Sequence, residues 1–152
     1  MKLVRFGEIG HEKPGLVDAE GRIRDLSAHI ADWTGEALTP QGLASIKALD
    51  PASLPKVEGS PRLGVPVGGA PKFVAIGLNY ADHAAEAGMA IPAEPIVFMK
   101  ATSSLCGPDD AVEKPRGSIK LDWEVELAVI IGTRAKYVSE ADALKHVAGY
   151  AV

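Results

Sequence analysis

The sequence feature that most limits the possible folds is an acidic stretch, residues 122–127, that runs directly into an apolar one, residues 128–132. Side chains alternate along an extended strand, so Asp122, Glu124 and Glu126 would share one face and three apolar side chains the other. The following run is apolar on both faces, as in a strand that enters a core. We therefore predict a β-strand that carries three carboxylates at the edge of a hydrophobic core.

These carboxylates are candidate ligands for a metal ion. Alternate positions on a strand lie about 6.5 Å apart, so two carboxylates can reach one cation. Clustered anions beside a core are unfavourable unless a cation compensates them. Oxygen ligands suit a hard ion, Mg²⁺, Mn²⁺ or Ca²⁺, and not zinc. The alternative is a solvated strand face, on which Lys120 offers only partial compensation.

Composition narrows the class of protein. Hydrophobic residues make up 47% of the 152 residues and charged residues 24%, which is typical of a globular chain. A net charge of -4 provides no basic surface for nucleic acid or anionic lipid. No apolar run is long enough for a signal peptide or a membrane span, so we expect a cytoplasmic protein. We expect the single cysteine, Cys106, to be a small buried hydrophobe.

A change in composition suggests a domain boundary. Five prolines and four glycines fall within residues 51–72, a density typical of a linker or an extended crossing. We predict a small N-terminal domain over residues 1–70, with a Pro/Gly-rich linker at about 51–71, and a second domain over residues 72–152.

Local signals predict the elements of the first domain. Residues 16–23 have the pattern of a hairpin, in which Gly21 would adopt a positive φ. Thr39 can cap a short helix over Pro40–Leu49, with Pro40 at the first helical position.

The second domain is expected to contain both strands and short helices. Asn79 could cap the first of its helices and Gly88 could end it. The expected elements are a strand over 72–76, a helix over 80–87, a buried strand over 95–100, a helix that Ser139 begins, and a strand starting near 148.

Two groups in this domain could take part in catalysis. His83 and Glu86 are three residues apart on the predicted helix and would share a face, where a carboxylate can fix the imidazole tautomer and raise its basicity. The alternative is an ordinary solvated helix face. Lys100 ends an apolar strand and could hold a substrate carboxylate, or it could simply extend into solvent.

Three segments together resemble the fumarylacetoacetate hydrolase family: residues 73–86, 95–104 and 122–132. The specific feature is the motif Asn-Tyr-x-x-His-x-x-Glu followed at this separation by Glu-x-Glu. The likeness is to bacterial members described as ureidoglycolate lyase or 2,4-diketo-3-deoxy-L-fuconate hydrolase. It implies an α+β, mainly β fold, in which a small β-rich N-terminal domain precedes the first part of a β-roll with short helices.

The resemblance also implies roles for the candidate residues. Glu124 and Glu126 would be two of three carboxylates that hold Mg²⁺ or Mn²⁺, His83 and Glu86 a dyad that activates water, and Lys100 a lysine near the active site. Asp122 has no role in the motif. The implied enzyme is a homodimeric hydrolase or lyase that cleaves C–C bonds of small 2-oxo or 2,4-dioxo acids through a metal-stabilised enolate.

The family's third metal ligand is an aspartate that follows a Gly-Tyr-x-Val strand, and this chain stops at Gly149–Val152. We therefore expect only the N-terminal part of the roll, with an incomplete metal site. Two alternatives stay open: C–N cleavage of the ureidoglycolate lyase type, or a non-catalytic fragment that self-associates.

Overall fold

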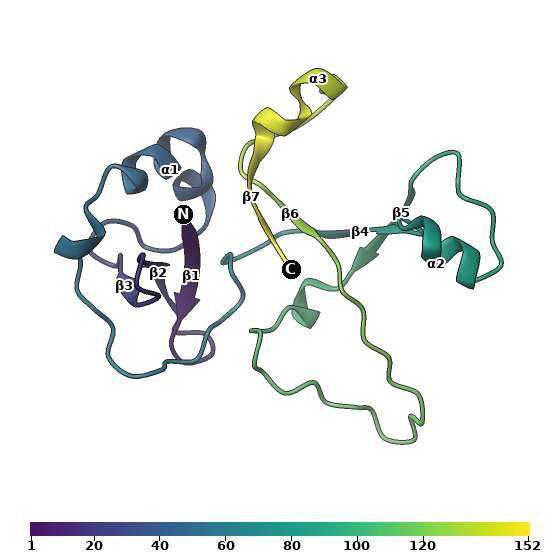
Figure 1. Ribbon diagram of the computed structural model, residues 1–152, viewed down its shortest axis with the longest axis horizontal. Helices are drawn as coiled ribbons and strands as arrows, with labels where there is room; N and C mark the ends of the chain where they lie inside the picture. The colour runs from purple at the N-terminus through teal and green to yellow at the C-terminus, as the bar shows by residue number, and fades with distance from the viewer. The chain divides into compact units, whose positions relative to one another are not determined.

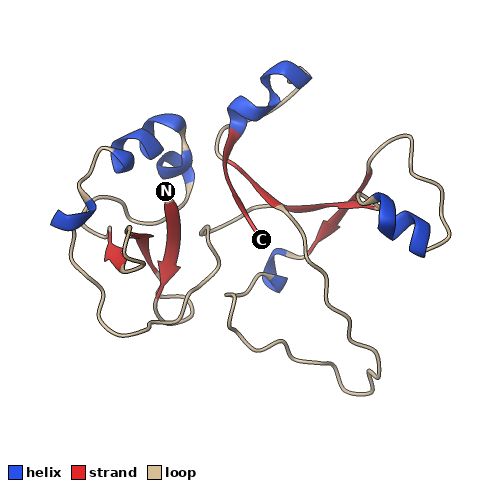
Figure 2. Cartoon of the chain, viewed as in Figure 1, coloured by secondary structure: helices blue, strands red, loops and turns tan.

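The computed structural model describes every residue, 1–152, in two compact units. The larger unit combines Met1–Gly68 with Cys106–Val152, and the smaller unit is Gly69–Leu105. Short strands and short helices joined by loops build both units (Figure 1, Figure 2). The predicted α+β, mainly β fold class is confirmed, whereas the proposed division into 1–70 and 72–152 stays a prediction.

The elements form three separate antiparallel sheets, β1–β2–β3, β4–β5 and β6–β7. The strands are β1 (Lys2–Phe6), β2 (Lys13–Val17), β3 (Ile23–Asp25), β4 (Phe73–Gly77), β5 (Ile96–Lys100), β6 (Ala128–Ile131) and β7 (Val147–Ala151). The α-helices are α1 (Pro40–Lys47), α2 (Ala81–Glu86) and α3 (Glu140–Ala143). Short 3-10 helices cover Gly35–Leu38, Pro51–Ser53, Thr102–Ser104 and Leu144–His146.

The hydrophobic core lies in the N-terminal part of the larger unit, around Trp33. Trp33 is fully buried, and its indole N–H donates to the carbonyl oxygens of Val4, at 3.0 Å, and Gly15, at 3.1 Å. A buried indole therefore leaves no polar group unpaired. The buried residues that pack together here are Leu16, Leu26, Trp33, Ile46 and Leu54.

The predicted turn and helix of this region are both present. Gly21 has a φ of +80° in the connection between β2 and β3, as expected for the hairpin. Thr39 is the N-cap of α1, and its side chain accepts a hydrogen bond from the backbone N–H of Gly42 at 3.1 Å. Helix α1 ends at Lys47, two residues before the predicted end at Leu49.

The Pro/Gly-rich stretch is extended and pairs with both edge strands of the N-terminal sheet, β1 and β3. Isolated bridges pair Lys56 with Arg24 and Leu63 with Phe6. Backbone N–H groups of the sheet and of the stretch donate across this contact, including Gly64 to the carbonyl of Arg5 at 2.8 Å. The sequence pattern thus produces backbone pairing without a regular strand.

Within the larger unit, two glycines allow the backbone of residues 106–152 to approach the backbone of residues 1–68 closely. A Cβ on Gly107 would meet the carbonyl oxygen of Leu63, and a Cβ on Gly132 would meet that of Leu38. Backbone atoms cannot move aside as a flexible side chain can, so any larger residue would separate these segments.

An ion-pair cluster joins the same two parts of the larger unit. The guanidinium of Arg62 donates to both carboxylate oxygens of Asp110 at 2.6 Å, and to Glu12 at 3.0 Å. Hydrogen bonds from Arg62, and then from the backbone N–H of Gly107, hold the pKa of Asp110 below its usual value. Burial opposes ionisation of Glu12, but hydrogen bonds from the backbone and Arg62 outweigh it and lower the pKa of Glu12.

In the smaller unit, β4 and β5 form a hairpin and α2 lies between them in sequence. Helix α2 ends at Glu86, one residue before the predicted end at 87, and Gly88 follows with a φ of +65°, as expected for the residue that terminates the helix. The N–H of Met89 donates to the carbonyl of Ala84, and that of Gly88 to Ala85, which is the Schellman pattern.

The predicted cap of α2 is wrong. The N-cap position is held by Tyr80, not Asn79, and no side chain caps the helix. Ser139 does occupy the predicted N-cap position of α3. Its hydroxyl, however, donates to the carboxylate of Asp142 and makes no hydrogen bond with the helix backbone.

The acidic segment is not the predicted strand. Residues 121–127 have no regular structure, and β6 begins only at Ala128. Ala128 pairs with Ala151, the last residue of β7, and none of the strands pairs with residues 121–127. Alternation alone does not make a strand, because a strand needs a hydrogen-bonded partner.

Two expectations of burial are also wrong. All five residues of β5 are exposed, although residues 95–100 were predicted to be buried, and Cys106 is exposed. The chain contains no helix that combines the length and the apolar character of a membrane span.

Candidate functional site

The most distinctive local geometry is the strand–turn–helix over residues 73–86. Strand β4 ends at Gly77, and the chain turns through Leu78 and Asn79 into α2. Leu78 has a φ of +47°, a left-handed conformation that a branched, bulky residue rarely adopts. Such conformations gather at functional sites, where the surrounding structure holds them. The turn is therefore the starting point of the candidate site.

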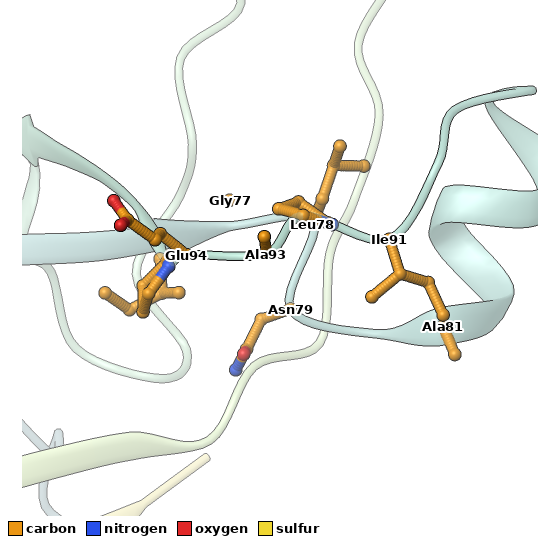
Figure 3. A pocket seen from close by; sticks show the side chains of 10 residues that line it. Gly77, Leu78, Asn79, Ala81, Ile91, Ala93 and Glu94 are labelled. Carbon is orange, nitrogen blue, oxygen red and sulfur yellow. The ribbon is translucent and has the colours of Figure 1, made fainter.

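A pocket of about 270 Å³ opens beside this turn, entirely within the smaller unit (Figure 3). Its walls are mainly apolar, and Asn79 and Glu94 are the polar side chains among them. This volume lies just below the range of about 300–1,000 Å³ that is typical of ligand pockets. The lining residues are Ile76, Gly77, Leu78, Asn79, Ala81, Ile91, Pro92, Ala93, Glu94 and Pro95.

His83 and Glu86 lie on α2, in the same short helix as predicted. Both side chains are exposed, and their spacing places them on one face one turn apart. No hydrogen bond joins the His83 ring to the Glu86 carboxylate, and neither residue lines the pocket. The structure therefore provides the spacing of a catalytic dyad, and the dyad itself stays a prediction.

Lys100 lies at the far end of the hairpin from the pocket. It pairs in register with Phe73, whereas the pocket-lining Gly77 pairs with Ile96 at the other end. The two pairs are four residue steps apart along the strands, which corresponds to about 13 Å. The structure does not bring Lys100 to the pocket.

Glu124 and Glu126 are exposed in the irregular segment that precedes β6. Nowhere in the chain do three or more His, Cys, Asp or Glu side chains form a group that could hold a metal ion. The chemistry of these two carboxylates nevertheless fits Mg²⁺ or Mn²⁺, which take oxygen ligands and readily keep waters. They belong to the larger unit, whereas His83, Glu86 and Lys100 belong to the smaller one.

The carboxylates with shifted pKa values lie outside the candidate site. Burial opposes ionisation of Asp18, yet hydrogen bonds from the backbone of Arg22 and from the side chains of Arg24 and Arg22 lower its pKa. The pKa of Asp142 is lowered first by Lys145 and then by Ser139. Each of these pKa shifts comes from hydrogen bonds and ion pairs with neighbouring residues, as is common in structural ion-pair networks.

Sequence reasoning missed most of the pocket. Leu78 carries no signal of its left-handed conformation, because glycine and asparagine are the usual residues there. The loop 91–95 does carry a signal, since Pro92 and Pro95 each restrict the backbone. Of the residues singled out from the sequence, only Asn79 lines the pocket.

Comparison with known proteins gives consistent results. The sequence model described as "Fumarylacetoacetate (FAA) hydrolase C-terminal" matches residues 72–152. Proteins of Burkholderia ambifaria and Burkholderia multivorans, both named "Putative hydrolase", are each 62% identical over all 152 residues. The chain covers 54% of the length of each, so it spans about half of the curated relatives that it matches.

A solved structure is similar in fold. The fumarylacetoacetate hydrolase of the psychrophile Exiguobacterium antarcticum is 32% identical, with a TM-score of 0.74, over 99% of this chain and 53% of that chain. The sequence model covers more than half of the present chain, including the strand–turn–helix and the acidic segment. On these grounds the chain belongs to the fumarylacetoacetate hydrolase family.

Proposed function

We propose that the chain forms part of a divalent-metal-dependent hydrolase or lyase that cleaves C–C bonds of small 2-oxo or 2,4-dioxo acids. The observation that carries the proposal is the strand–turn–helix over residues 73–86. It sets His83 and Glu86 one helical turn apart, directly after the left-handed Leu78 at the pocket. It also lies within the residues that match the family.

Hydrolysis needs a base that takes a proton from water, and His83 is the proposed base. The His83 side chain is exposed to solvent, from which the water would come. Glu86 would accept a hydrogen bond from the other ring nitrogen and so fix the tautomer. Lys100 is the proposed lysine near the active site, and it lies at the other end of the β4–β5 hairpin from the pocket.

Glu124 and Glu126 are the proposed protein ligands of Mg²⁺ or Mn²⁺. Both carboxylates are exposed and separated by one residue, so water has access to any ion they hold. When bound, the ion would polarise the substrate carbonyl and stabilise the negative charge that develops on its oxygen.

The test is hydrolysis of an acylpyruvate with Mg²⁺ or Mn²⁺, followed by loss of the enol absorbance. The assay would use this chain joined to the part of the Burkholderia ambifaria relative that lies outside the match. His83→Ala should lower kcat about 100-fold or more, because it removes the general base. His29→Ala is the matched control, since His29 is exposed and lies outside the three family-like segments.

Metal binding is measured separately by titration calorimetry. Glu124→Ala should weaken Mg²⁺ binding, and an unchanged affinity would exclude Glu124 as a ligand. An unchanged kcat in His83→Ala would exclude the dyad. Turnover of ureidoglycolate but of no acylpyruvate would replace C–C hydrolysis by C–N cleavage.

A further inference from the structure

A second pocket, of about 340 Å³, lies within the larger unit. Its walls come from the tip of the β2–β3 hairpin, from the Pro/Gly-rich stretch and from Asp109, and none of the residues proposed for catalysis or metal binding lines it. The volume falls within the range of about 300–1,000 Å³ that is typical of ligand pockets. The pocket is therefore large enough for a small molecule.

Hydrogen bonds within the chain hold the walls of this pocket in place. The backbone N–H of Val57 donates to the carbonyl of Ile23 at 2.9 Å, which joins the Pro/Gly-rich stretch to the hairpin. Asp109 precedes Asp110, whose two carboxylate oxygens accept hydrogen bonds from Arg62 at 2.6 Å. A ligand would thus enter a site whose walls are already ordered, which lowers the entropic cost of binding.

Part of the lining is apolar. Ile23, Val57 and Leu63 contribute to it, and each of these side chains is half-buried. An apolar portion of a ligand that covered them would remove their remaining exposed surface from water, which favours binding.

The two cationic side chains of the lining are already paired with carboxylates of the chain. Arg22 forms ion pairs with Asp18 at 2.9 Å and with Glu20 at 2.5 Å. Lys56 forms one with Glu58 at 3.0 Å. A ligand anion would have to compete with these carboxylates for either cation, so the pocket is not built for an anion.

Asp109 and Ser60 are the hydrogen-bonding groups of the lining that remain available. The carboxylate of Asp109 makes no ion pair or hydrogen bond with the rest of the chain, and the hydroxyl of Ser60 makes no hydrogen bond with it. Both oxygens can accept from the three N–H groups of an ammonium, and charge-assisted hydrogen bonds are about twice as strong as neutral ones. An unpaired anion beside apolar side chains favours a molecule with a cationic head and an apolar body.

We propose that this pocket binds a small primary ammonium compound with a short apolar chain. The ammonium would donate to the Asp109 carboxylate and the Ser60 hydroxyl, and the apolar chain would cover Ile23, Val57 and Leu63. The proposed substrates, 2-oxo and 2,4-dioxo acids, carry the opposite charge, and Asp109 would repel them. The pocket is thus a second ligand site, and it does not depend on the proposed reaction.

The test adds isopentylammonium to the full 152-residue chain at low ionic strength, where charge interactions are least screened. Chemical shifts of the backbone amides of Val57, Ser60 and Leu63 follow binding, and saturable shifts are the expected result. Isocaproate and isopentanol carry a carboxylate or a hydroxyl on the same apolar chain, and they should bind at least about 10-fold more weakly. Ammonium chloride, which has no apolar body, should cause no saturable shift.

Asp109→Asn tests the acceptor, and Glu113→Gln is its matched control. Asp109→Asn removes the charge, keeps the shape and breaks no hydrogen bond of the chain, so the variant is expected to fold. It should weaken binding of isopentylammonium about 10-fold. Glu113 is also exposed but does not line the pocket, so Glu113→Gln should leave the affinity unchanged.

Three outcomes would overturn the proposal. Equal affinities for isopentylammonium and isocaproate would show that charge does not decide binding. Equal losses in Asp109→Asn and Glu113→Gln would indicate a general attraction of cations to a chain with a net charge of -4. A chain without substitutions whose pocket amides show no saturable shift up to the solubility limit of isopentylammonium has no such site.

Discussion

Residues 1–68 and residues 69–105 differ in how far their own sequence completes their folding. The first region buries Trp33, Leu26 and Leu16 beneath a three-stranded sheet. The second has a comparable supply of apolar side chains, but Ala84 is its one buried hydrophobic residue. Apolar content is thus not the difference. The first region contains enough elements to form two layers, and the second contains one hairpin and one short helix.

The largest expected effect contrasts two aromatic side chains. Trp33→Ala should lower the free energy of unfolding by about 3–5 kcal/mol, because it leaves a cavity in the core. Phe98→Ala, at an exposed position of β5, should lower it by less than about 1 kcal/mol. Urea unfolding followed by far-UV circular dichroism measures both. Equal losses would mean that the hairpin is as well packed as the core.

The Arg62 cluster provides a second contrast, this time in pH dependence. The pKa values of Asp110 and Glu12 are lowered in the folded chain. Their contribution to the free energy of unfolding is therefore complete above the usual carboxyl pKa of about 4. The contribution is lost as the pH falls through the lowered folded-state values. Urea midpoints should therefore drop with acidification, and less steeply in Arg62→Ala than in the unsubstituted chain.

The control for this prediction is Lys56→Ala, which breaks only an exposed pair with Glu58. It should leave both the midpoint at neutral pH and its pH dependence unchanged. If the urea midpoint of Arg62→Ala falls with pH as steeply as that of the unsubstituted chain, the cluster does not contribute to acid sensitivity.

Substitutions at the helix N-termini of the two regions should change stability by a smaller amount. Thr39→Ala should destabilise the larger unit by about 1 kcal/mol, because it removes the hydrogen bond to the Gly42 amide. Thr39→Ser should restore most of that loss. Asn79→Ala should not change the stability of α2, since Asn79 is not its cap. Hydrogen exchange of the α1 and α2 amides distinguishes these outcomes.

An effect of similar size to that of the Thr39 cap concerns the left-handed turn at Leu78. Leu78→Ile should destabilise the smaller unit by roughly 1 kcal/mol, because β-branching makes a positive φ more costly. Leu78→Asn should be nearly neutral, since asparagine tolerates that conformation. If Leu78→Ile leaves exchange of the α2 amides unaltered, the turn carries no strain.

Two local signals in the sequence predicted the structure correctly, although the Asn79 cap was wrong, and two predictions that depend on a distant partner failed. The Gly21 hairpin and the Thr39 cap depend on neighbouring residues and were right. The strand at 122–127 and the burial of 95–100 were wrong, because each needs a second segment that the pattern cannot supply.

The candidate site follows the same rule. Residue spacing placed His83 and Glu86 on one short helix, which the structure contains. The pocket depends on the left-handed Leu78 and on the loop 91–95, and neither follows from periodicity. The predicted roles of Lys100, Glu124 and Glu126 require residues from separate segments, so spacing alone could not test them.

The close contacts of Gly107 with Leu63 and of Gly132 with Leu38 bear on the order of events during synthesis. The N-terminal sheet and its core are complete within residues 1–68 and can form as soon as they leave the ribosome. Both contacts must wait until the whole of Gly69–Leu105 has been made, and their loops must then close at an entropic cost. The larger unit is therefore expected to mature in two steps, with the exposed hairpin emerging between them.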